Sequence, residues 1–277
     1  MDICAVVLSA GEGTRLRPLT AALPKALCPV GNVALLDRAL DRLDRHNLSG
    51  PAQVAVNACY LADRVVTHVG DRAHLSCEPG PPALGTAGAL CHLRDWVAGR
   101  AVLAVNGDAY LAPATDLVPD LGPLLNGWDG RTVRVLTVPA GDRPAEFRGT
   151  RFAGVSLLPA DLVSALPSGH CELVLTVWRP AERAGRLEIV PYGGWYVDTG
   201  TRGDYLAANL HAAGLAGGSI VAADAQVSGP VIASVVGSGA VVAGSITRCV
   251  VLPGGRVAPG EELVDAIRIG ADVTMQC

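Results

Sequence analysis

A glycine-rich segment with fixed cations follows the first apolar run of the chain. Residues 8–31 read LSAGEGTRLRPLTAALPKALCPVG, so that Gly11 and Gly13 precede Arg15 and Lys25. Glycines directly behind a buried strand let backbone N–H groups approach an anion. Two cations beside such a loop suit a ligand with several negative charges. The segment therefore favours a site for a polyphosphate.

Two common phosphate-binding motifs do not fit this segment. A GxGxxG dinucleotide fingerprint requires a third glycine where the chain has Leu16, and no GK[ST] sequence completes a Walker A loop. For the loop taken alone, the alternative is a tight turn between a strand and a helix that binds no ligand.

Two acidic residues lie where open α/β sheets hold their ligands. Asp108 follows the apolar strand AVLAVNG, and Asp198 follows the aromatic-rich run WYV. Each carboxylate is expected to emerge at the carboxyl end of a strand. Mg²⁺ prefers one or two carboxylates together with phosphate oxygens and water, so both residues are candidate metal ligands. Each aspartate, taken alone, also fits a helix N-cap or a turn.

The elements that must position these residues alternate along the chain from residue 3 to about 215. Short β-rich runs such as ICAVVLS, VAVNA and AVLAVNG alternate with helical segments. This alternation predicts βαβ units and a mainly parallel sheet with helices on both faces. In the segment 35–48, Leu36, Leu40 and Leu43 recur every three to four residues, which predicts an amphipathic helix on the sheet.

The C-terminal part has a different period. After about residue 216 the chain can be written in rows of fifteen residues that are rich in Gly, Ala and Ser. Aligned aliphatic columns are expected when the coils of a β-solenoid stack, and a Val- and Gly-rich β-meander is the alternative. Three rows are few for a solenoid, so we expect them to pack on the preceding part or on another subunit. The columns are Val221, Val236 and Val251, and Val227, Val242 and Val257.

Composition argues against several classes of partner. The net charge of −4 and the lack of Lys/Arg runs predict no nucleic-acid surface. Charged residues, Gly or Pro interrupt the long apolar stretches, and the N-terminus has no basic region with a cleavage site, which predicts a soluble cytoplasmic protein without membrane contact. The eight cysteines form no CxxC pair and no zinc-spaced cluster, so they are expected to be reduced and structural.

The order of the motifs resembles that of the sugar-1-phosphate nucleotidylyltransferases. The first segment is similar to their signature G-x-G-x-R-x-x-P-L-T followed by P-K and P-V. LGTAGAL at 84–90, VNGDAYL at 105–111, GGWYVDTGTRGDYLAANL at 193–210 and the C-terminal rows follow in the family's order. The resemblance implies an α/β fold, with a Rossmann-like, mainly parallel sheet and flanking helices, plus a short C-terminal left-handed β-helix. It implies a nucleotidyltransferase domain at 1–215 and a hexapeptide-repeat β-helix at 216–277.

The resemblance also implies an activity. Such enzymes transfer a nucleoside monophosphate from an NTP to a sugar 1-phosphate or similar phosphate and release pyrophosphate, by Mg²⁺-dependent in-line attack on the α-phosphate. Because two anions must meet, catalysis rests on positioning and charge neutralisation. The resemblance assigns Arg15 and Lys25 to catalysis, and Asp108 and Asp198 to the metal. The residues that it assigns to the nucleotide are Ala10, Gly11, Gly13, Glu78, Gly85, Thr86, Gly88 and Gly107.

The resemblance does not determine which base the nucleotide carries. Glu78 corresponds to a Gln or Glu that contacts the base in the family. An ionised carboxylate only accepts hydrogen bonds, which mildly favours guanine with its two adjacent N–H donors. Glu78 also fits a solvated charge on the rim, and LGTAG occurs in both guanylyl and uridylyl members. We therefore expect GTP or UTP.

The acceptor site departs from the family pattern. The Glu-Lys-Pro motif that holds the sugar in most relatives is missing, and the chain has AGDRPAEFRGTRFAG there. Arg148 or Arg151 is the candidate cation for the sugar phosphate, although an exposed turn arginine is the alternative. The segment resembles the cell-wall-recycling uridylyltransferases, and a heptose or cyclitol phosphate stays open as acceptor.

Two other functions are compatible with parts of the chain. One is a catalytically silent homologue that binds a nucleotide sugar and regulates an active subunit. The retention of Arg15, Lys25, Asp108 and Asp198 argues against it. The other is an acyltransferase in the C-terminal rows, which needs a histidine there, whereas none of the six histidines lies beyond residue 211. We expect the β-helix to stabilise the protein or to pair copies of it.

Overall fold

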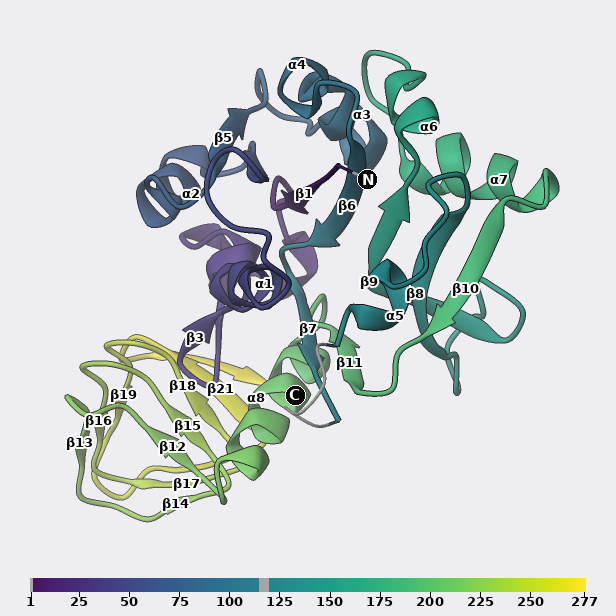
Figure 1. Cartoon of the computed structure of the whole chain (residues 1–277). Coiled ribbons are helices and arrows are strands. Elements are labelled where there is room, and N and C mark those ends of the chain that lie inside the picture. Colours follow the sequence, from purple (N-terminus) through teal and green to yellow (C-terminus); the bar gives the residue numbers. More distant parts are fainter. Residues whose placement is uncertain (1, 115–119) are drawn as a thin grey trace.

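The central sheet has seven strands (Figure 1). They are β1 (Ile3–Leu8), β4 (Val54–Ala58), β5 (His74–Cys77), β6 (Ala101–Asn106), β8 (Val133–Pro139), β9 (Thr150–Leu158) and β10 (Leu187–Pro191). Their order is β10-β8-β9-β6-β1-β4-β5. Only β9 runs antiparallel to its neighbours β6 and β8, so the predicted mainly parallel sheet is confirmed. The computed structural model describes residues 2–114 and 120–277.

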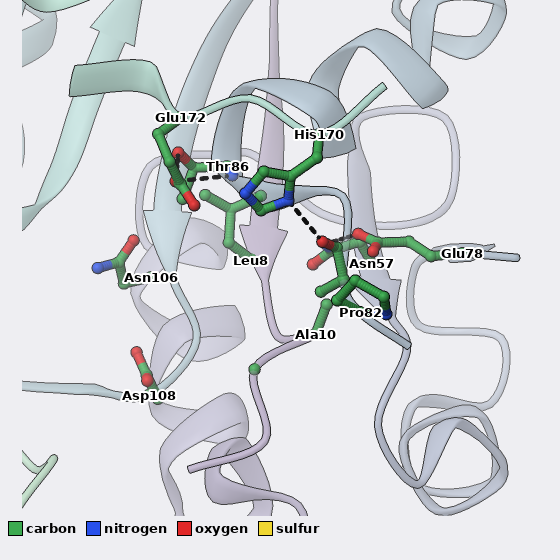
Figure 2. A pocket seen from close by; sticks show the side chains of 13 residues that line it. Leu8, Ala10, Asn57, Glu78, Pro82, Thr86, Asn106, Asp108, His170 and Glu172 are labelled. Carbon is green, nitrogen blue, oxygen red and sulfur yellow. Dashed lines mark hydrogen bonds between the residues drawn. The ribbon is translucent and has the colours of Figure 1, made fainter. Parts of the chain in front are cut away.

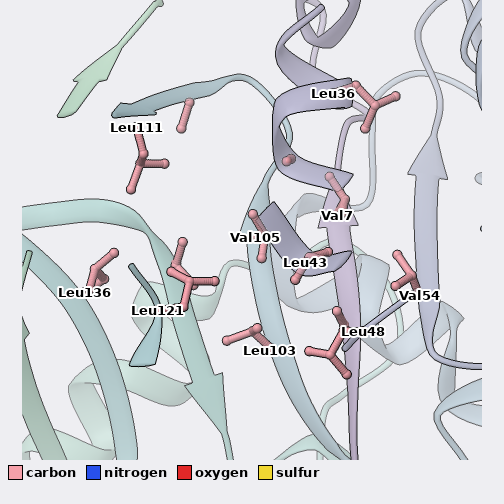
Figure 3. Close-up of a cluster of buried hydrophobic side chains, with 14 of the residues drawn as sticks. Val7, Leu36, Leu43, Leu48, Val54, Leu103, Val105, Leu111, Leu121 and Leu136 are labelled. Carbon is pink, nitrogen blue, oxygen red and sulfur yellow. The ribbon is translucent and has the colours of Figure 1, made fainter. Parts of the chain in front are cut away.

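Helices cover both faces of this sheet. Alternate side chains of a strand point to opposite faces, and in β1 Val7 joins one apolar cluster while Val6 joins the other. In Figure 3, Leu36 and Leu43 pack beside Val7, as the predicted amphipathic pattern requires. The helices are α1 (Leu35–Asp44), α2 (Ala62–Val69), α3 (Gly85–His92), α4 (Arg94–Val97), α5 (Gly122–Leu125), α6 (Ala160–Ser164), α7 (Arg179–Arg183), α8 (Arg202–Leu215) and the π-helical turn η4 (Val174–Trp178). Within residues 2–114 and 120–277, no helix has both the length and the apolar character needed to cross a bilayer.

The glycine-rich loop after β1 does not lead directly into a helix. It forms three 3-10 turns, η1 (Thr14–Leu16), η2 (Leu19–Ala21) and η3 (Lys25–Leu27), before the hairpin β2 (Pro29–Val30) and β3 (Val33–Ala34) and then α1. Gly13 has a φ of 62°, and a Cβ there would lie 3.0 Å from the Cβ of Lys25. Glycine therefore lets the loop fold back against Lys25.

A two-stranded ribbon joins distant parts of the sequence. Strands β7 (Ala109–Ala112) and β11 (Trp195–Asp198) are antiparallel, and Asp198 pairs with Ala109. Asp108 immediately precedes β7, so this register places the two predicted metal ligands side by side.

The C-terminal strands form the parallel stacks of a β-helix. The stacks are β12-β15-β18-β21, β13-β16-β19 and β14-β17-β20, and β22 closes the first stack antiparallel to β21. Val236 pairs with Val221 and Val251, as the rows predict, whereas Val251 pairs with Arg268 because the last coil is longer. The strands are β12 (Ile220–Val221), β13 (Gln226–Val227), β14 (Val231–Ile232), β15 (Val235–Val236), β16 (Val241–Val242), β17 (Ser245–Thr247), β18 (Val250–Val251), β19 (Arg256–Val257), β20 (Glu262–Val264), β21 (Ala266–Ile269) and β22 (Val273–Gln276).

The β-helix packs against the α/β part of the chain, beside α8 (Figure 1). Its outward residues Val235, Val250 and Ile267 share one buried cluster with Tyr205 of α8 and with residues of the glycine-rich loop such as Leu16. The backbone of the β-helix also accepts a hydrogen bond from the Asn32 side chain. The coils therefore support the element that carries Arg15 and Lys25.

Candidate active site

Lys25 bridges the two aspartates expected to bind the metal. Its Nζ lies 2.8 Å from Oδ2 of Asp108 and 3.1 Å from Oδ1 of Asp198, and only 8% of the lysine side chain is exposed. Burial lowers the pKa of Lys25, but the two carboxylates raise it by more, so the ammonium group stays charged at neutral pH. Arg15 extends the cluster, with Nη2 3.8 Å from Asp198 Oδ2, and is largely exposed. The structure thus brings all four of these predicted residues together.

A cavity of about 370 Å³ opens beside this cluster (Figure 2). It lies at the carboxyl ends of β1 and β6, next to the first turn of α3. Figure 2 shows Asn106 and Asp108 across the cavity from Glu78. Of the residues expected to bind the nucleotide, Ala10, Gly11, Glu78, Gly85 and Thr86 line it.

The other three glycines of that set serve close packing instead of lining the cavity. Gly13 packs on Lys25, as described above. A Cβ on Gly107 would lie 2.5 Å from Oγ of Ser9, and one on Gly88 would lie 2.4 Å from the carbonyl oxygen of Gly169. These glycines therefore fix the backbone that presents Asp108 and the first turn of α3.

A buried polar network holds the far wall of the cavity. Asn57 Oδ1 accepts from the backbone N–H of Ser9 at 2.6 Å, and Asn57 Nδ2 donates to Glu78 Oε1 at 2.7 Å. The other Glu78 oxygen accepts from the backbone N–H of Leu84 at 2.6 Å. Both carboxylate oxygens of Glu78 are thus bound to protein donors, so Glu78 does not present the open pair of acceptors on which the guanine preference rested.

Glu172 holds the first turn of α3. Its Oε2 accepts from the Thr86 hydroxyl at 2.7 Å and from the Thr86 backbone N–H at 3.1 Å, as expected for a carboxylate at a helix N-terminus. The N–H groups of Ala87 and Gly88 donate to the carbonyl oxygen of Cys171. The segment around 171 therefore occupies backbone donors that the sequence analysis assigned to the nucleotide.

A second compartment of about 290 Å³ adjoins the first and shares Leu8, Thr86, Asn106 and Glu172 with it. Its further walls come from β9 and η4. Among them, Ser156 Oγ and Trp178 Nε1 are buried without a hydrogen-bond partner in the described part of the chain. The compartment is lined by Leu8, Thr86, Ala104, Asn106, Glu146, Phe152, Ser156, Glu172, Leu173, Val174 and Trp178.

The two arginines expected at the acceptor phosphate lie in different places. Arg148 sits in an exposed turn with a φ of 43°, and it is not among the residues that line either compartment. The guanidinium carbon of Arg151 lies 5.0 Å from the centroid of the Tyr196 ring, two residues before Asp198. Burial and the nearby Asp198 raise the pKa of Tyr196, so its hydroxyl stays protonated. Arg151 also lines neither compartment, and only its contact with Tyr196, near Asp198, favours it over the exposed Arg148.

Comparisons with known proteins show the family of the chain. The profile of the nucleotidyl transferase family matches residues 4–119. N-acetylmuramate alpha-1-phosphate uridylyltransferase of Caulobacter vibrioides is 37% identical over 222 residues, which cover 69% of this chain and 89% of that protein. The chain belongs to the nucleotidyl transferase family.

More distant relatives and a solved structure are also similar to this chain. The Neisseria meningitidis protein of the same name is 25% identical, with 71% of this chain and 93% of that protein covered. The bifunctional protein GlmU of Methanococcus maripaludis is 23% identical over 75% of this chain, which spans only 54% of that protein. A Bacillus anthracis structure assigned as a glucose-1-phosphate thymidylyltransferase has the same fold, with a TM-score of 0.63 at 20% identity, covering 76% of this chain and 95% of that one.

Several residues of the site were missed in the sequence. Asn57 had a visible signal, because it is the polar residue in the otherwise apolar strand VAVNA. Glu146, Glu172 and Trp178 lie in a stretch without a motif. Only the tertiary fold, which packs η4 and β9 against α3, brings them to the cavity.

Proposed function

We propose that this chain transfers the uridylyl group of UTP to a sugar 1-phosphate and releases pyrophosphate. The bridging of Asp108 and Asp198 by Lys25, at the mouth of a nucleotide-sized cavity, carries the proposal. UTP is preferred over GTP because two relatives are named uridylyltransferases and because the oxygens of Glu78 already accept from the protein.

The roles of the cations follow from the reaction. The acceptor phosphate oxygen attacks the α-phosphorus in line, the bond to the β-phosphate breaks, and pyrophosphate leaves. Arg15 and Lys25 neutralise the charge on the transferring and leaving oxygens. Lys25 also orients both carboxylates, since its ammonium group contacts one oxygen of each.

Asp108 and Asp198 fit a magnesium ion. Two partly exposed carboxylates on one ribbon leave the remaining positions to phosphate oxygens and water, which is the donor set that Mg²⁺ prefers. When bound, Mg²⁺ supplies charge stabilisation at the phosphates. The nucleoside occupies the cavity between Gly11, Glu78 and Gly85, and Arg151 receives the acceptor phosphate beside Tyr196.

A panel assay tests this proposal. Pyrophosphate release is measured with ATP, CTP, GTP and UTP against several sugar 1-phosphates in the presence of Mg²⁺. UTP with at least one acceptor is expected to give the highest kcat/KM. No turnover with any pair would favour the catalytically silent homologue. When the aspartates of the site are substituted in this assay, Asp71→Asn, at an exposed loop residue, is the control for a change of charge alone.

We also propose that residues 216–277 act as a separate supporting unit that pairs copies of the chain. Its first coil exposes Val221, Val227 and Ile232, and β12, β13 and β14 each have one unpaired edge among the described strands. Such edges and aliphatic surfaces favour coverage by another surface. Light scattering of the full chain against a chain ending at Gly217 tests this, and equal subunit numbers would reject it.

A further inference from the structure

Resting on the proposed transferase function, we infer that the acceptor carries a positively charged amino group, which Glu146 and Glu172 bind in the second compartment. The acceptor class is thus an amino-sugar 1-phosphate whose nitrogen is not acylated. The inference comes from the charge and the unpaired polar atoms of that compartment.

Two carboxylates line the compartment, and each keeps one oxygen available. Oε2 of Glu146 accepts from the backbone N–H of Phe152 at 3.0 Å, and Oε2 of Glu172 accepts from Thr86. Among the described residues, neither Oε1 of Glu146 nor Oε1 of Glu172 accepts a hydrogen bond. An ammonium group has three donors and no acceptor, so it is the ligand group that matches two such oxygens.

The described lining contains no lysine or arginine to balance these charges. Two guanidinium groups lie near the compartment but outside its lining. Arg179 binds Glu182 Oε2 at 2.6 Å and the carbonyl oxygen of Glu146 at 2.8 Å, and Arg151 lies over Tyr196. An acidic acceptor group is therefore repelled in this compartment, and an ammonium group is attracted.

The rest of the lining suits a sugar ring with such a group. The rings of Phe152 and Trp178 lie 4.4 Å apart between centroids, and aromatic faces attract a nearby cation. Ser156 Oγ and Trp178 Nε1 are fully buried in the wall and out of a ligand's reach, so the polar groups of the lining left for a sugar are the carboxylates of Glu146 and Glu172 and the side chains of Thr86 and Asn106. Asn106 and Thr86 belong to both compartments, which places the phosphate end of such an acceptor toward the nucleotide.

This inference separates the chain from the relatives named for N-acetylmuramate. That sugar has an acylated nitrogen and carries a carboxylate, whereas the compartment presents two carboxylates of its own. The same transferase chemistry would then serve an acceptor whose sugar carries a cationic group in place of an anionic one.

The experiment compares four acceptors at pH 7 with UTP and Mg²⁺: the 1-phosphates of glucose, glucosamine, N-acetylglucosamine and N-acetylmuramate. We expect kcat/KM for glucosamine 1-phosphate to exceed that for glucose 1-phosphate by about tenfold or more, the size of one charge-assisted contact. Glu146→Gln keeps an acceptor for the Phe152 N–H but should remove most of this ratio. Glu262→Gln, which changes an exposed carboxylate in the β-helix, should leave it intact.

Preference for N-acetylmuramate 1-phosphate, or an unchanged ratio in Glu146→Gln, would overturn the inference while the transferase function stands. If no acceptor gives pyrophosphate, the proposed function fails, and calorimetric titration of glucosamine 1-phosphate and glucose 1-phosphate decides the inference. Tighter binding of the amine that is lost in Glu146→Gln supports it, and equal or no binding overturns it.

Discussion

The two adjoining compartments differ in how their polar atoms are satisfied. On the nucleotide side, Asn57 and Glu78 use their side-chain oxygens and nitrogen on partners within the protein. On the acceptor side, Glu146 and Glu172 each use Oε2 on a protein donor, and in the described part of the chain Oε1 of each accepts no hydrogen bond. The first wall is therefore rigid before any ligand arrives, whereas the second gains its hydrogen bonds from the ligand. Such a division lets one nucleotide wall serve different acceptors.

The largest effect is expected at the ion cluster beside the nucleotide compartment. Asp108→Asn keeps the shape of the side chain but removes the charge that Lys25 and Mg²⁺ contact. We expect kcat/KM to fall by about a thousandfold for every acceptor, with the melting temperature little changed, because the side chain is partly exposed. Initial rates and thermal melts measure both. Chelation of Mg²⁺ by EDTA should abolish wild-type turnover. Activity above about a tenth of wild type would remove Asp108 from the site.

Removal of the β-helix should lower stability and change substrate binding in both compartments to the same extent. A chain that ends at Gly217 exposes Tyr205 and Leu16 in the cluster shared with Val235, Val250 and Ile267. We expect the melting temperature to fall by about 5 °C or more. In the folded fraction, the KM values for UTP and for the acceptor should change together. A change in only one of these two KM values would show that the coils of the β-helix form part of one compartment.

Asn57→Ala should damage the nucleotide side alone. It leaves the Ser9 N–H and one Glu78 oxygen buried without partners, which costs about 1–3 kcal/mol in the free energy of unfolding. We expect the KM for UTP to rise while the KM for the acceptor stays constant. Urea unfolding and steady-state kinetics test this, with the exposed Asn126→Ala as control. An equal rise of both KM values would contradict the division between the compartments.

Low pH should lower the free energy of unfolding, and so affect both compartments alike. Asp120 and Arg42 form a buried ion pair at 2.7 Å. Burial raises the pKa of the Asp120 carboxyl, but His46 and Arg42 lower it by more, so its folded pKa lies below the ordinary value. The stability from this shift is present above the unfolded pKa of about 3.9 and is lost as pH falls toward the folded pKa.

Asp120→Asn tests this acid dependence. The variant should be less stable at pH 7, and its free energy of unfolding should decline less than that of wild type below pH 4. The difference is at most about 1.4 kcal/mol per pH unit. Parallel curves for the two proteins would exclude Asp120 as the source.

The smallest effect is expected from Ser156→Ala on the acceptor side. Its hydroxyl has no partner in the described structure, so its removal should leave the free energy of unfolding nearly unchanged or slightly higher. The KM for the acceptor should also stay within about twofold, because this hydroxyl is fully buried behind the wall and forms no hydrogen bond with the acceptor. Thr137→Val removes another buried, unpartnered hydroxyl, on β8 and outside the compartment, and should likewise leave KM unchanged. A several-fold rise in KM for Ser156→Ala alone would show that Ser156 does contact the acceptor.

The sequence predicts the parts of this protein that depend on local pattern. The alternation of strands and helices identifies the parallel sheet, and the valine columns identify the stacked coils, since each pattern reports which face a residue buries. Lys25, Asp108 and Asp198 were found because each follows a strand or lies in a motif of the resemblance.

The rest of the site depends on contacts that no local pattern encodes. Glu172 reaches Thr86 only because the segment before η4 packs on α3, and this pairing joins residues far apart in the chain. The hydrogen bonds of Glu78 could not be predicted for the same reason. Its partner Asn57 becomes a neighbour only when β4 and β5 lie side by side.

The π-helical turn η4 determines how a one-residue deletion would affect the acceptor compartment. It carries Val174 and Trp178 in the wall of the acceptor compartment, and a π turn accommodates one residue more than an α turn. Loss of a single codon here would restore α-helical geometry, and the residues that follow, Trp178 included, would keep their face of the helix. The wall of the acceptor compartment would lose one residue while every strand of the sheet kept its register. A one-residue deletion can thus alter the acceptor wall without touching the machinery that handles the nucleotide.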